Sequence, residues 1–281
     1  MSLNPQRLRE AASGCPLEDW LIAALRHPIT KQTLEERDGR TIDGILDLRP
    51  ALHAVQKWST GQKFYEAWEK VQIRTGTVEM FQRELSSVRA IYATMAITGA
   101  CLDVGGLDGR IRHFMRPGQR YACVDPYPFA ISDIRQQPAL TTVYPELKSP
   151  VNFVCGMAEH LPLDSAVFDT VHMRSVIDHF YDPAVALREA ARVLKPGCQL
   201  IVGVSVEGGQ LGIPSIKERV RETLRSILVW LGIERYRDHH MWHPTWPNLK
   251  QMIEAAGFLC DAPYWQNARV VYVRAVKSEQ A

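Results

Sequence analysis

The residues with the clearest chemical potential lie in a short glycine-rich segment. Asp103 is the only acidic residue in an otherwise apolar run, 100–104, and Gly105, Gly106 and Gly109 follow it. Glycine lets the backbone pass close to a ligand, and a helix that starts after the turn presents unpaired N–H groups. A strand, a glycine turn and a helix start together predict a cofactor cradle.

The spacing of the glycines separates two classes of cofactor. A dinucleotide fingerprint needs G-x-G-x-x-G, which glycines at 105, 106 and 109 cannot form. The segment reads D-x-G-x-x-x-G from Asp103 to Gly109 and resembles the first motif of the class I S-adenosylmethionine-dependent methyltransferases. That motif is usually D-x-G-x-G-x-G, and Leu107 stands here in place of the middle glycine. Taken alone, the segment also fits a tight strand-to-helix turn without a ligand.

A second acidic residue, Asp125, ends the next predicted strand, 119–124, and Pro126 follows it. It lies about 20 residues beyond the glycine turn, where a carboxylate can accept hydrogen bonds from two ribose hydroxyls. The resemblance therefore implies that Asp125 and Pro126 bind the cofactor. An ordinary Asp that ends a strand before a turn proline is the alternative.

The third predicted strand, 151–155, leads into a segment that resembles the adenine-binding part of the same family. Met157, Ala158 and Glu159 follow its glycine, and the resemblance implies that they bind the cofactor. Many members carry Asp where this chain has Met157. We therefore expect the thioether to pack on the adenine ring instead of contacting its amino group.

Asp178 and His179 are the candidate catalytic residues. They follow the fourth predicted strand, which ends near Arg174, and we count Arg174 among the cofactor-binding residues. An imidazole with an ordinary pKa of about 6.5 suits a general base, and Asp178 would orient it or bind substrate. Alternatively, this segment is only a structured turn, because adjacent side chains often point apart. An amine or enolate acceptor would also need no base.

The order of the remaining pieces matches the same family. Residues 183–194 have the apolar spacing of a helix that Lys195-Pro196-Gly197 ends, and 199–206 is a nearly continuous apolar run. The stretch 187–202 is similar to the family pattern LREAARVLKPGG-LIV, so the chain is identified as a member over residues 98–276. The resemblance implies an α/β fold with a doubly wound, seven-stranded Rossmann-like sheet that ends in an antiparallel hairpin.

The activity implied is methyl transfer from S-adenosylmethionine to a small-molecule or lipid-linked acceptor, with oxygen slightly favoured as the accepting atom. The sulfonium methyl is already electrophilic, so the protein must chiefly position the acceptor and exclude water. Two alternatives stay open. One is a protein that binds S-adenosylmethionine without transferring its methyl, and the other is a methyltransferase that acts on RNA or protein.

The residues before the matched region divide into two parts. Residues 1–57 contain Asp-Gly turns at 38–39 and 43–44 and predict a small β-rich extension. It resembles a zinc-ribbon-derived module without its cysteines, because His27 and Thr30 stand where C-x-x-C would be; an unrelated extension is the alternative. Residues 58–99 predict a helical lead-in, in which Tyr65 and Trp68 either pack in the core or close over the cofactor.

The methyltransferase domain, expected over 100–281, contains a helical insertion at 207–244. Its apolar residues recur at helical spacing with basic residues between them, which predicts an amphipathic helix. This helix would act as a lid on its own domain, as a homodimer face, or as a contact to a membrane surface. The histidines at 239, 240 and 243 complete no recognised ligand spacing, so we expect a pocket-lining loop and no metal.

Composition narrows the class of protein further. The 281 residues carry a net charge of +2, too little to make nucleic acid an obligatory partner. The six cysteines are scattered without a C-x-x-C pair, which favours free thiols in a reducing compartment. The N-terminus is polar, and no apolar stretch is long enough for a transmembrane helix. We therefore expect a cytoplasmic protein.

Overall fold

The computed structural model describes residues 6, 8, 9, 12–35, 38, 40–50, 56–128, 137–233 and 237–278. Its strands are β1 (Arg40–Ile42), β2 (Ile45–Asp47), β3 (Cys101–Val104), β4 (Tyr121–Asp125), β5 (Phe153–Cys155), β6 (Phe168–Arg174), β7 (Leu194–Ser205), β8 (Phe258–Cys260), β9 (Tyr264–Trp265) and β10 (Val270–Lys277). Its α-helices are α2 (Asp19–Ala24), α3 (Gln56–Thr75), α4 (Val78–Thr94), α6 (Pro138–Val143), α7 (Pro183–Val193), α8 (Ile216–Trp230) and α9 (Trp246–Ala255). Its 3₁₀ turns are η2 (Arg110–Phe114), η3 (Pro145–Lys148), η4 (Ala158–His160), η5 (Ile177–His179) and η6 (Gly209–Leu211).

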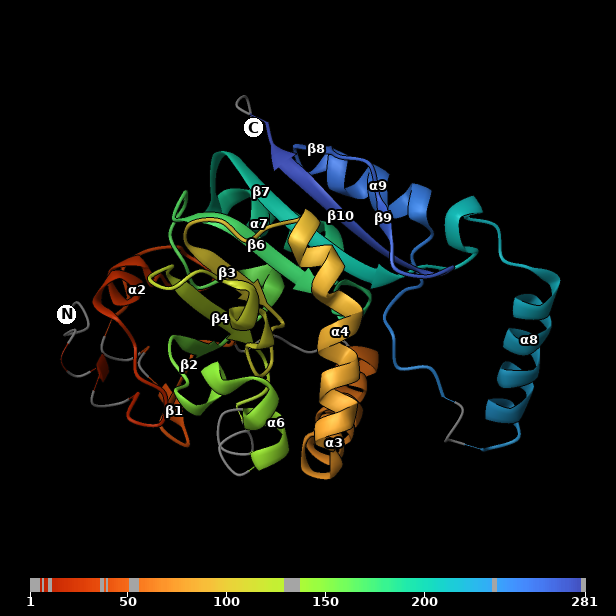
Figure 1. The fold of residues 1–281 in the computed structure, drawn as a ribbon, viewed down its shortest axis with the longest axis horizontal. Helices are drawn as coiled ribbons and strands as arrows, with labels where there is room; N and C mark the ends of the chain where they lie inside the picture. Colours follow the sequence, from red (N-terminus) through yellow and green to blue (C-terminus); the bar gives the residue numbers. More distant parts are fainter. Residues whose placement is uncertain are drawn as a thin grey trace.

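One mixed sheet forms the centre of the molecule (Figure 1). Across the described residues its order is β1-β2-β5-β4-β3-β6-β7-β10-β8, with β9 paired to β10. Strands β5, β4, β3, β6 and β7 run parallel, whereas β10 is antiparallel to both β7 and β8. The predicted fold class, a doubly wound sheet with a final antiparallel hairpin, is confirmed. The described sheet has ten strands where seven were expected, because β1 and β2 extend it beyond β5 and β9 pairs with β10.

The central strands are apolar because both faces of the sheet are covered. Every residue of β3 and β4 is buried, which explains why their sequences are continuous apolar runs without polar alternation. Two of these buried residues, Asp103 and Asp125, are acidic, and they lie toward the carboxyl ends of their strands. Ligands of open α/β sheets bind at that edge.

The N-terminal hairpin extends the central sheet. β1 and β2 pair around Asp43 and Gly44, whose φ angles of 52° and 73° are those of a hairpin turn that favours Asp-Gly. β2 then pairs in parallel with β5, with Leu46 opposite Val154. The β-rich extension expected at 1–57 therefore shares its sheet with the domain that follows.

Helices α3 and α4 overlap in the view of Figure 1, and only residues 76 and 77 separate them along the chain. The Thr77 side chain accepts a hydrogen bond from the Met80 amide and caps the start of α4. The face that α4 turns inward is apolar at helical spacing and buries Phe81, Leu85, Val88, Ile91 and Tyr92. Val88, Ile91 and Tyr92 share a core cluster with Cys101 of β3 and Cys123 of β4, so α4 packs against these strands.

Helix α8 stands away from the body of the molecule (Figure 1). It begins with a capping box between Ser215 and Glu218 and forms where the amphipathic spacing predicts a helix. None of its fifteen residues, all of them described, is buried, so the packing on its own domain that we expected is not seen. Among the described residues, no helix has the length and hydrophobicity that a bilayer-spanning segment needs.

Candidate functional site

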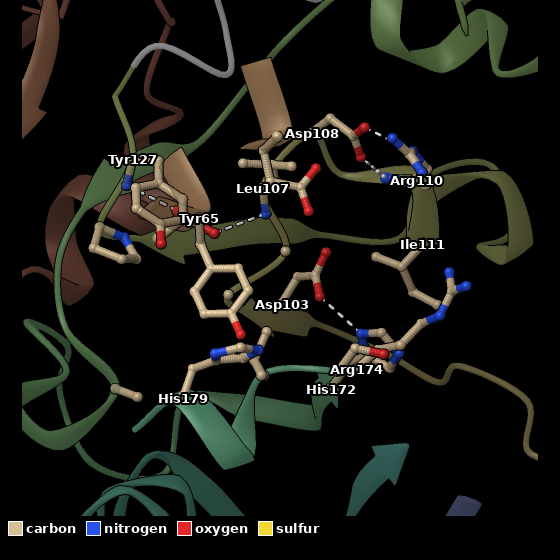
Figure 2. Close-up of a pocket in the computed structure, with 18 of the residues that line it drawn as sticks. Tyr65, Asp103, Leu107, Asp108, Arg110, Ile111, Tyr127, His172, Arg174 and His179 are labelled. Atoms are coloured by element: carbon tan, nitrogen blue, oxygen red, sulfur yellow. Dashed lines mark hydrogen bonds and ion pairs between the residues drawn. The ribbon is translucent and has the colours of Figure 1, made fainter. Parts of the chain in front are cut away.

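A cavity of about 300 Å³ opens at the carboxyl ends of β3, β4 and β6 (Figure 2). Of the thirteen site residues that the sequence predicts, eleven line it: Asp103, Gly105, Gly106, Leu107, Asp125, Pro126, Met157, Ala158, Glu159, Arg174 and His179. Gly109 and Asp178 are not among the lining residues. The cavity therefore joins segments that are widely separated in the sequence.

The glycine turn, residues 105–109, approaches its neighbours too closely for larger side chains. Gly105 has a φ of +67°, and a Cβ on it would lie 2.6 Å from the Val176 side chain. A Cβ on Gly106 would overlap the Asp103 carboxylate. Leu107, which replaces the usual middle glycine, keeps a φ of 47° that non-glycine residues rarely adopt. The turn thus retains the backbone of the glycine-rich motif despite the substitution.

Asp125 is held at the end of β4 by two backbone amides. Its Oδ2 accepts a 2.9 Å hydrogen bond from Leu107, and its Oδ1 accepts one of 2.8 Å from Tyr127. Burial raises the pKa of this carboxyl to about 7, against the opposing effect of the two amides. A carboxylate offers about four acceptor positions, so two remain for the vicinal hydroxyls of a ribose. The site residues fit an adenosyl cofactor here.

Asp103 is committed to a buried chain of hydrogen bonds. Its Oδ1 accepts a 2.7 Å hydrogen bond from His172 Nδ1, and His172 Nε2 lies 2.8 Å from the Tyr92 hydroxyl (Figure 2). His172 and Tyr92 also line the cavity, and the sequence analysis missed both. The alternation of β6 places His172 inward, but nothing local indicates that its partner is 69 residues away.

The predicted adenine segment forms one wall of the cavity. Met157 and Ala158 are buried, with 4% and 7% of their surfaces exposed, and both line the cavity beside Pro126. Glu159 accepts a 2.8 Å hydrogen bond from the Tyr181 amide, and burial raises the pKa of its carboxyl to about 7. Glu159 therefore also fixes the backbone just before α7.

One face of α3 forms a second wall, which the sequence analysis identified only in part. Trp58, Gln62, Tyr65 and Glu69 line the cavity and recur at helical spacing. Of the two aromatic candidates, Tyr65 reaches the cavity, whereas Trp68 is 47% exposed. The polar and aromatic positions on one helical face are the signal that could have revealed this wall.

Two guanidinium groups share a carboxylate at the end of the cavity next to the glycine turn. Glu84 Oε2 lies 2.6 Å from Arg110 Nη1, and Glu84 Oε1 lies 3.0 Å from Arg174 Nη1. Arg110 also contacts Asp108, at 2.6 Å. Guanidinium groups suit the carboxylate of an amino-acid moiety. Asp108 and Arg110 line the cavity and were not predicted.

His179 lies at the far side of the cavity, against Tyr65 (Figure 2). The two ring centroids are 4.2 Å apart. His179 Nε2 is 3.8 Å from Asp178 Oδ1, beyond hydrogen-bond distance, so the expected orientation of His179 by Asp178 is not formed. Within the described residues, His179 Nδ1 and Asp178 Oδ1 are buried without a hydrogen-bond partner. Burial lowers the pKa of His179 and favours its neutral form.

The histidine loop, residues 238–243, lies directly behind His179. The His179 and His240 rings are 4.7 Å apart between centroids, and His240 Nε2 lies 3.2 Å from the Tyr65 hydroxyl. His240 Nδ1 donates to Asp238 Oδ1 at 2.8 Å, which forms the Asp–His pair that Asp178 and His179 do not. We expected this loop to line the pocket. It instead packs behind Tyr65 and His179, which line the pocket.

Comparison with known proteins agrees with this geometry. The family model of a methyltransferase domain matches residues 102–202. The 27-O-demethylrifamycin SV methyltransferase of Amycolatopsis mediterranei (strain S699) is 32% identical over 90 residues, which are 32% of this chain and 33% of that protein. An uncharacterised Escherichia coli (strain K12) protein, YafE, is 49% identical over 47 residues, or 17% of this chain and 23% of that protein. The chain thus spans about a quarter to a third of the curated relatives it matches.

Solved structures share the fold at low sequence identity. A Thermotoga maritima protein described as a possible histamine N-methyltransferase superposes with a TM-score of 0.54 and 22% identity, over 79% of this chain and 100% of that one. The 1,6-didemethyltoxoflavin-N1-methyltransferase of Burkholderia thailandensis superposes with a TM-score of 0.51 and 16% identity, over 83% of this chain and 95% of that one. The chain thus contains a methyltransferase domain over residues 102–202, and its sheet has the fold of these solved structures.

Proposed function

We propose that this protein transfers the methyl group of S-adenosylmethionine to an oxygen atom of a small-molecule acceptor. The observation that carries the proposal is the arrangement of the cavity. The glycine turn and Asp125 form one side, and Tyr65 of α3 and His179 of η5 face it (Figure 2). A cofactor held on the first side would present its methyl group toward the second.

The side chains have distinct tasks in this proposal. Asp125 accepts hydrogen bonds from the ribose, and Met157 packs on the adenine ring. Arg110 and Arg174 bind the carboxylate of the amino-acid end, where Glu84 already holds both guanidinium groups in place. When bound, S-adenosylmethionine supplies the electrophilic methyl. Trp58 and the other residues of the α3 wall exclude water and hold the acceptor in line.

Two relatives support a small acceptor, and one of them supports oxygen. The Amycolatopsis relative is named for an O-methylation of a rifamycin, although the match covers a third of its length. The Burkholderia structure contains a bound small-molecule substrate together with S-adenosylhomocysteine. His179 would contact the acceptor, because it is the imidazole that lines the cavity opposite the glycine turn.

The test is a methyl-transfer assay on the purified chain. S-adenosylmethionine with a radiolabelled methyl is incubated with panels of small hydroxyl compounds and amines, and labelled products are identified by mass spectrometry. We expect transfer to a hydroxyl, and His179→Ala should lower kcat at least about tenfold while S-adenosylhomocysteine affinity is retained. Transfer only to amines would contradict the oxygen assignment. Tight cofactor binding without transfer to any compound would favour the non-catalytic alternative.

A lipid-linked acceptor is the second candidate, and helix α8 favours it. The helix exposes an apolar stripe, and basic residues flank it, as in helices that lie on anionic membranes. The exposed apolar residues on and beside the helix are Leu211, Ile213, Ile216, Val220, Leu224, Ile227, Trp230 and Leu231. The basic residues of the helix are Lys217, Arg219, Arg221 and Arg225.

Vesicle flotation tests this second candidate. The protein should float with phosphatidylcholine vesicles that contain phosphatidylserine, and less with phosphatidylcholine alone. Leu224→Asp places a charge in the stripe and should abolish flotation, whereas Ser226→Asp adds the same charge on the polar face of the helix and should have a smaller effect. A protein that stays in solution with both vesicles and forms a dimer that Leu224→Asp disrupts would contradict membrane contact.

A further inference from the structure

Three side chains beside the cavity could together hold a metal ion. Asp178 and His179 come from η5, and His240 comes from the histidine loop. Each offers one ligand atom, and the three atoms lie within 4.8 Å of one another. His179 also lines the cavity, so this cluster lies where the acceptor would bind.

The protein itself leaves two of these groups unsatisfied. Asp178 is 9% exposed, and its Oδ1 has no hydrogen-bond partner among the described residues. His179 Nδ1 is also buried without a hydrogen-bond partner among the described residues. Buried polar atoms normally find partners, and a binding site for an ion is one recognised reason for an exception. His179 Nε2 and Asp178 Oδ1 are 3.8 Å apart, beyond hydrogen-bond distance, so these two neighbouring residues do not satisfy each other.

The third residue is oriented as metal-binding histidines usually are. His240 Nδ1 donates to Asp238 Oδ1 at 2.8 Å, which leaves Nε2 directed toward Asp178, 3.7 Å from Oδ2. A metal-binding imidazole generally donates its other ring N–H to a carboxylate in this way. Asp238 is in turn held by Arg225 of α8 at 2.7 Å and by His243.

Two hydrogen bonds to backbone carbonyls hold the two segments together without any ion. The Met241 amide donates to the Asp178 carbonyl at 2.8 Å, and Trp242 Nε1 donates to the Ile177 carbonyl at the same distance. The cluster is therefore formed before a ligand arrives. The Tyr65 hydroxyl, 3.2 Å from His240 Nε2, is the competing partner that an ion would displace.

We propose that Asp178, His179 and His240 form a binding site for a divalent transition-metal ion of the Zn²⁺ type. Two imidazoles and one carboxylate suit Zn²⁺, Co²⁺ or Fe²⁺, whereas Ca²⁺ and Mg²⁺ prefer ligands that are all oxygen. Three protein ligands leave a coordination position open. Because His179 lies in the cavity wall, the open coordination position would face the acceptor.

This inference deepens the proposed function, on which its catalytic part rests. An acceptor hydroxyl bound at the open position becomes more acidic and releases its proton to solvent water. Its oxygen then bonds to the methyl carbon while the carbon–sulfur bond breaks, and that electron pair stays on sulfur as S-adenosylhomocysteine. Asp178 and His179 would thus contribute as ligands instead of transferring the proton themselves.

Cobalt titration of the full chain tests the site directly. Chelator-treated protein is titrated with Co²⁺, and the visible absorption of the protein-bound ion is recorded before Zn²⁺ is added to displace it. The parent should bind one equivalent. Asp178→Asn and His240→Gln should each weaken binding at least tenfold, and Asp238→Asn should weaken it about 10–100-fold through the loss of orientation. His239→Gln is the matched control, because it removes a neighbouring imidazole outside the cluster, and it should bind Co²⁺ like the parent.

Each contrary outcome has a distinct meaning. No binding of Co²⁺ or Zn²⁺ by a folded parent would overturn the site. Loss of binding in His243→Gln but not in Asp178→Asn would move the ion to the neighbouring cluster of Asp238, His240 and His243 and overturn the assignment. Full methyl transfer by the metal-free protein would overturn the catalytic part and leave the proposed function intact. Tight, site-specific Co²⁺ binding without methyl transfer would support the site and contradict the function.

Discussion

The Leu107 amide donates a 2.9 Å hydrogen bond to Asp125 Oδ2 and so ties the glycine turn to the end of β4. The residue that departs from the glycine-rich motif is thus the one that contacts the carboxylate proposed to bind the ribose. We therefore expect changes at the carboxylate or in the turn to alter cofactor binding.

Asp125→Ala should weaken S-adenosylhomocysteine binding about 10–100-fold. The substitution removes two hydrogen bonds to a charged acceptor, each contributing about 1.5–3 kcal/mol, and partial compensation by water reduces the sum. Isothermal titration calorimetry measures the change. Asp164→Asn, a partly exposed carboxyl remote from the cavity, is the control and should bind like the parent. Equal affinity of Asp125→Ala and the parent would exclude the carboxylate from the cofactor site.

Gly106→Ala should impair both stability and cofactor binding. The added methyl overlaps the Asp103 carboxylate, and such overpacking costs about 1–3 kcal/mol in the free energy of unfolding. Gly118→Ala is the matched control: its φ of +83° makes alanine costly by about 1–2 kcal/mol, but nothing lies within 4 Å of the new methyl. Both variants should lose stability in urea titrations, and only Gly106→Ala should lose affinity. A loss of affinity in both would contradict a local effect on the cradle.

Asp125→Asn should gain stability relative to the parent as pH rises. Burial raises the pKa of Asp125 to about 7, so its stabilising contribution is complete below the unfolded pKa near 3.8 and is lost as pH rises through about 7. Asparagine has no such dependence. Between about pH 5.5 and pH 8 the difference in unfolding free energy should move by about 2 kcal/mol in favour of the variant.

Glu159→Gln provides a second test of the same linkage. Burial raises the pKa of this carboxyl to about 7 as well, so the difference from the parent should change in the same direction over the same pH window. Chemical denaturation of both proteins at a series of pH values gives the comparison. Curves for Glu159→Gln and the parent that stay parallel across the window would show that burial does not control this carboxyl.

His172→Ala should destabilise the fold. It removes the 2.7 Å partner of the buried Asp103 carboxylate and leaves the Tyr92 hydroxyl unpaired, at a cost of about 3–5 kcal/mol. Tyr92→Phe leaves only His172 Nε2 without its partner and should cost about 1–3 kcal/mol. His113→Ala, a more exposed histidine 3.4 Å from Glu146, should cost less than about 1 kcal/mol. Similar losses for His172→Ala and His113→Ala would contradict the buried chain.

The features that the sequence revealed are local ones. The glycine turn, the acidic end of β4 and the apolar strands around them follow from residues within a few positions of one another. The hairpin at Asp43 and Gly44 formed for the same reason, because its turn chemistry is written in two adjacent residues. The pairing of β2 with β5 depends on which edge of the sheet is open, and no local pattern carries that information.

The features that the sequence did not reveal depend on long-range contacts. His172 meets Asp103 across two paired strands, and His240 meets Asp178 only because the histidine loop folds back onto η5. Helix α8 formed as its amphipathic spacing predicts, yet spacing does not say what covers an apolar face. Tyr65 was foreseen as an aromatic near the cofactor, but its proximity to His179 and His240 was not.

A crystal structure of this protein with S-adenosylhomocysteine would show directly how the cavity binds the cofactor. We expect the ribose hydroxyls on Asp125, the adenine beside Met157, the amino-acid carboxylate near Arg110 and Arg174, and the sulfur on the side that faces His179. A ligand bound elsewhere, or bound in the cavity with its sulfur turned away from His179, would contradict it.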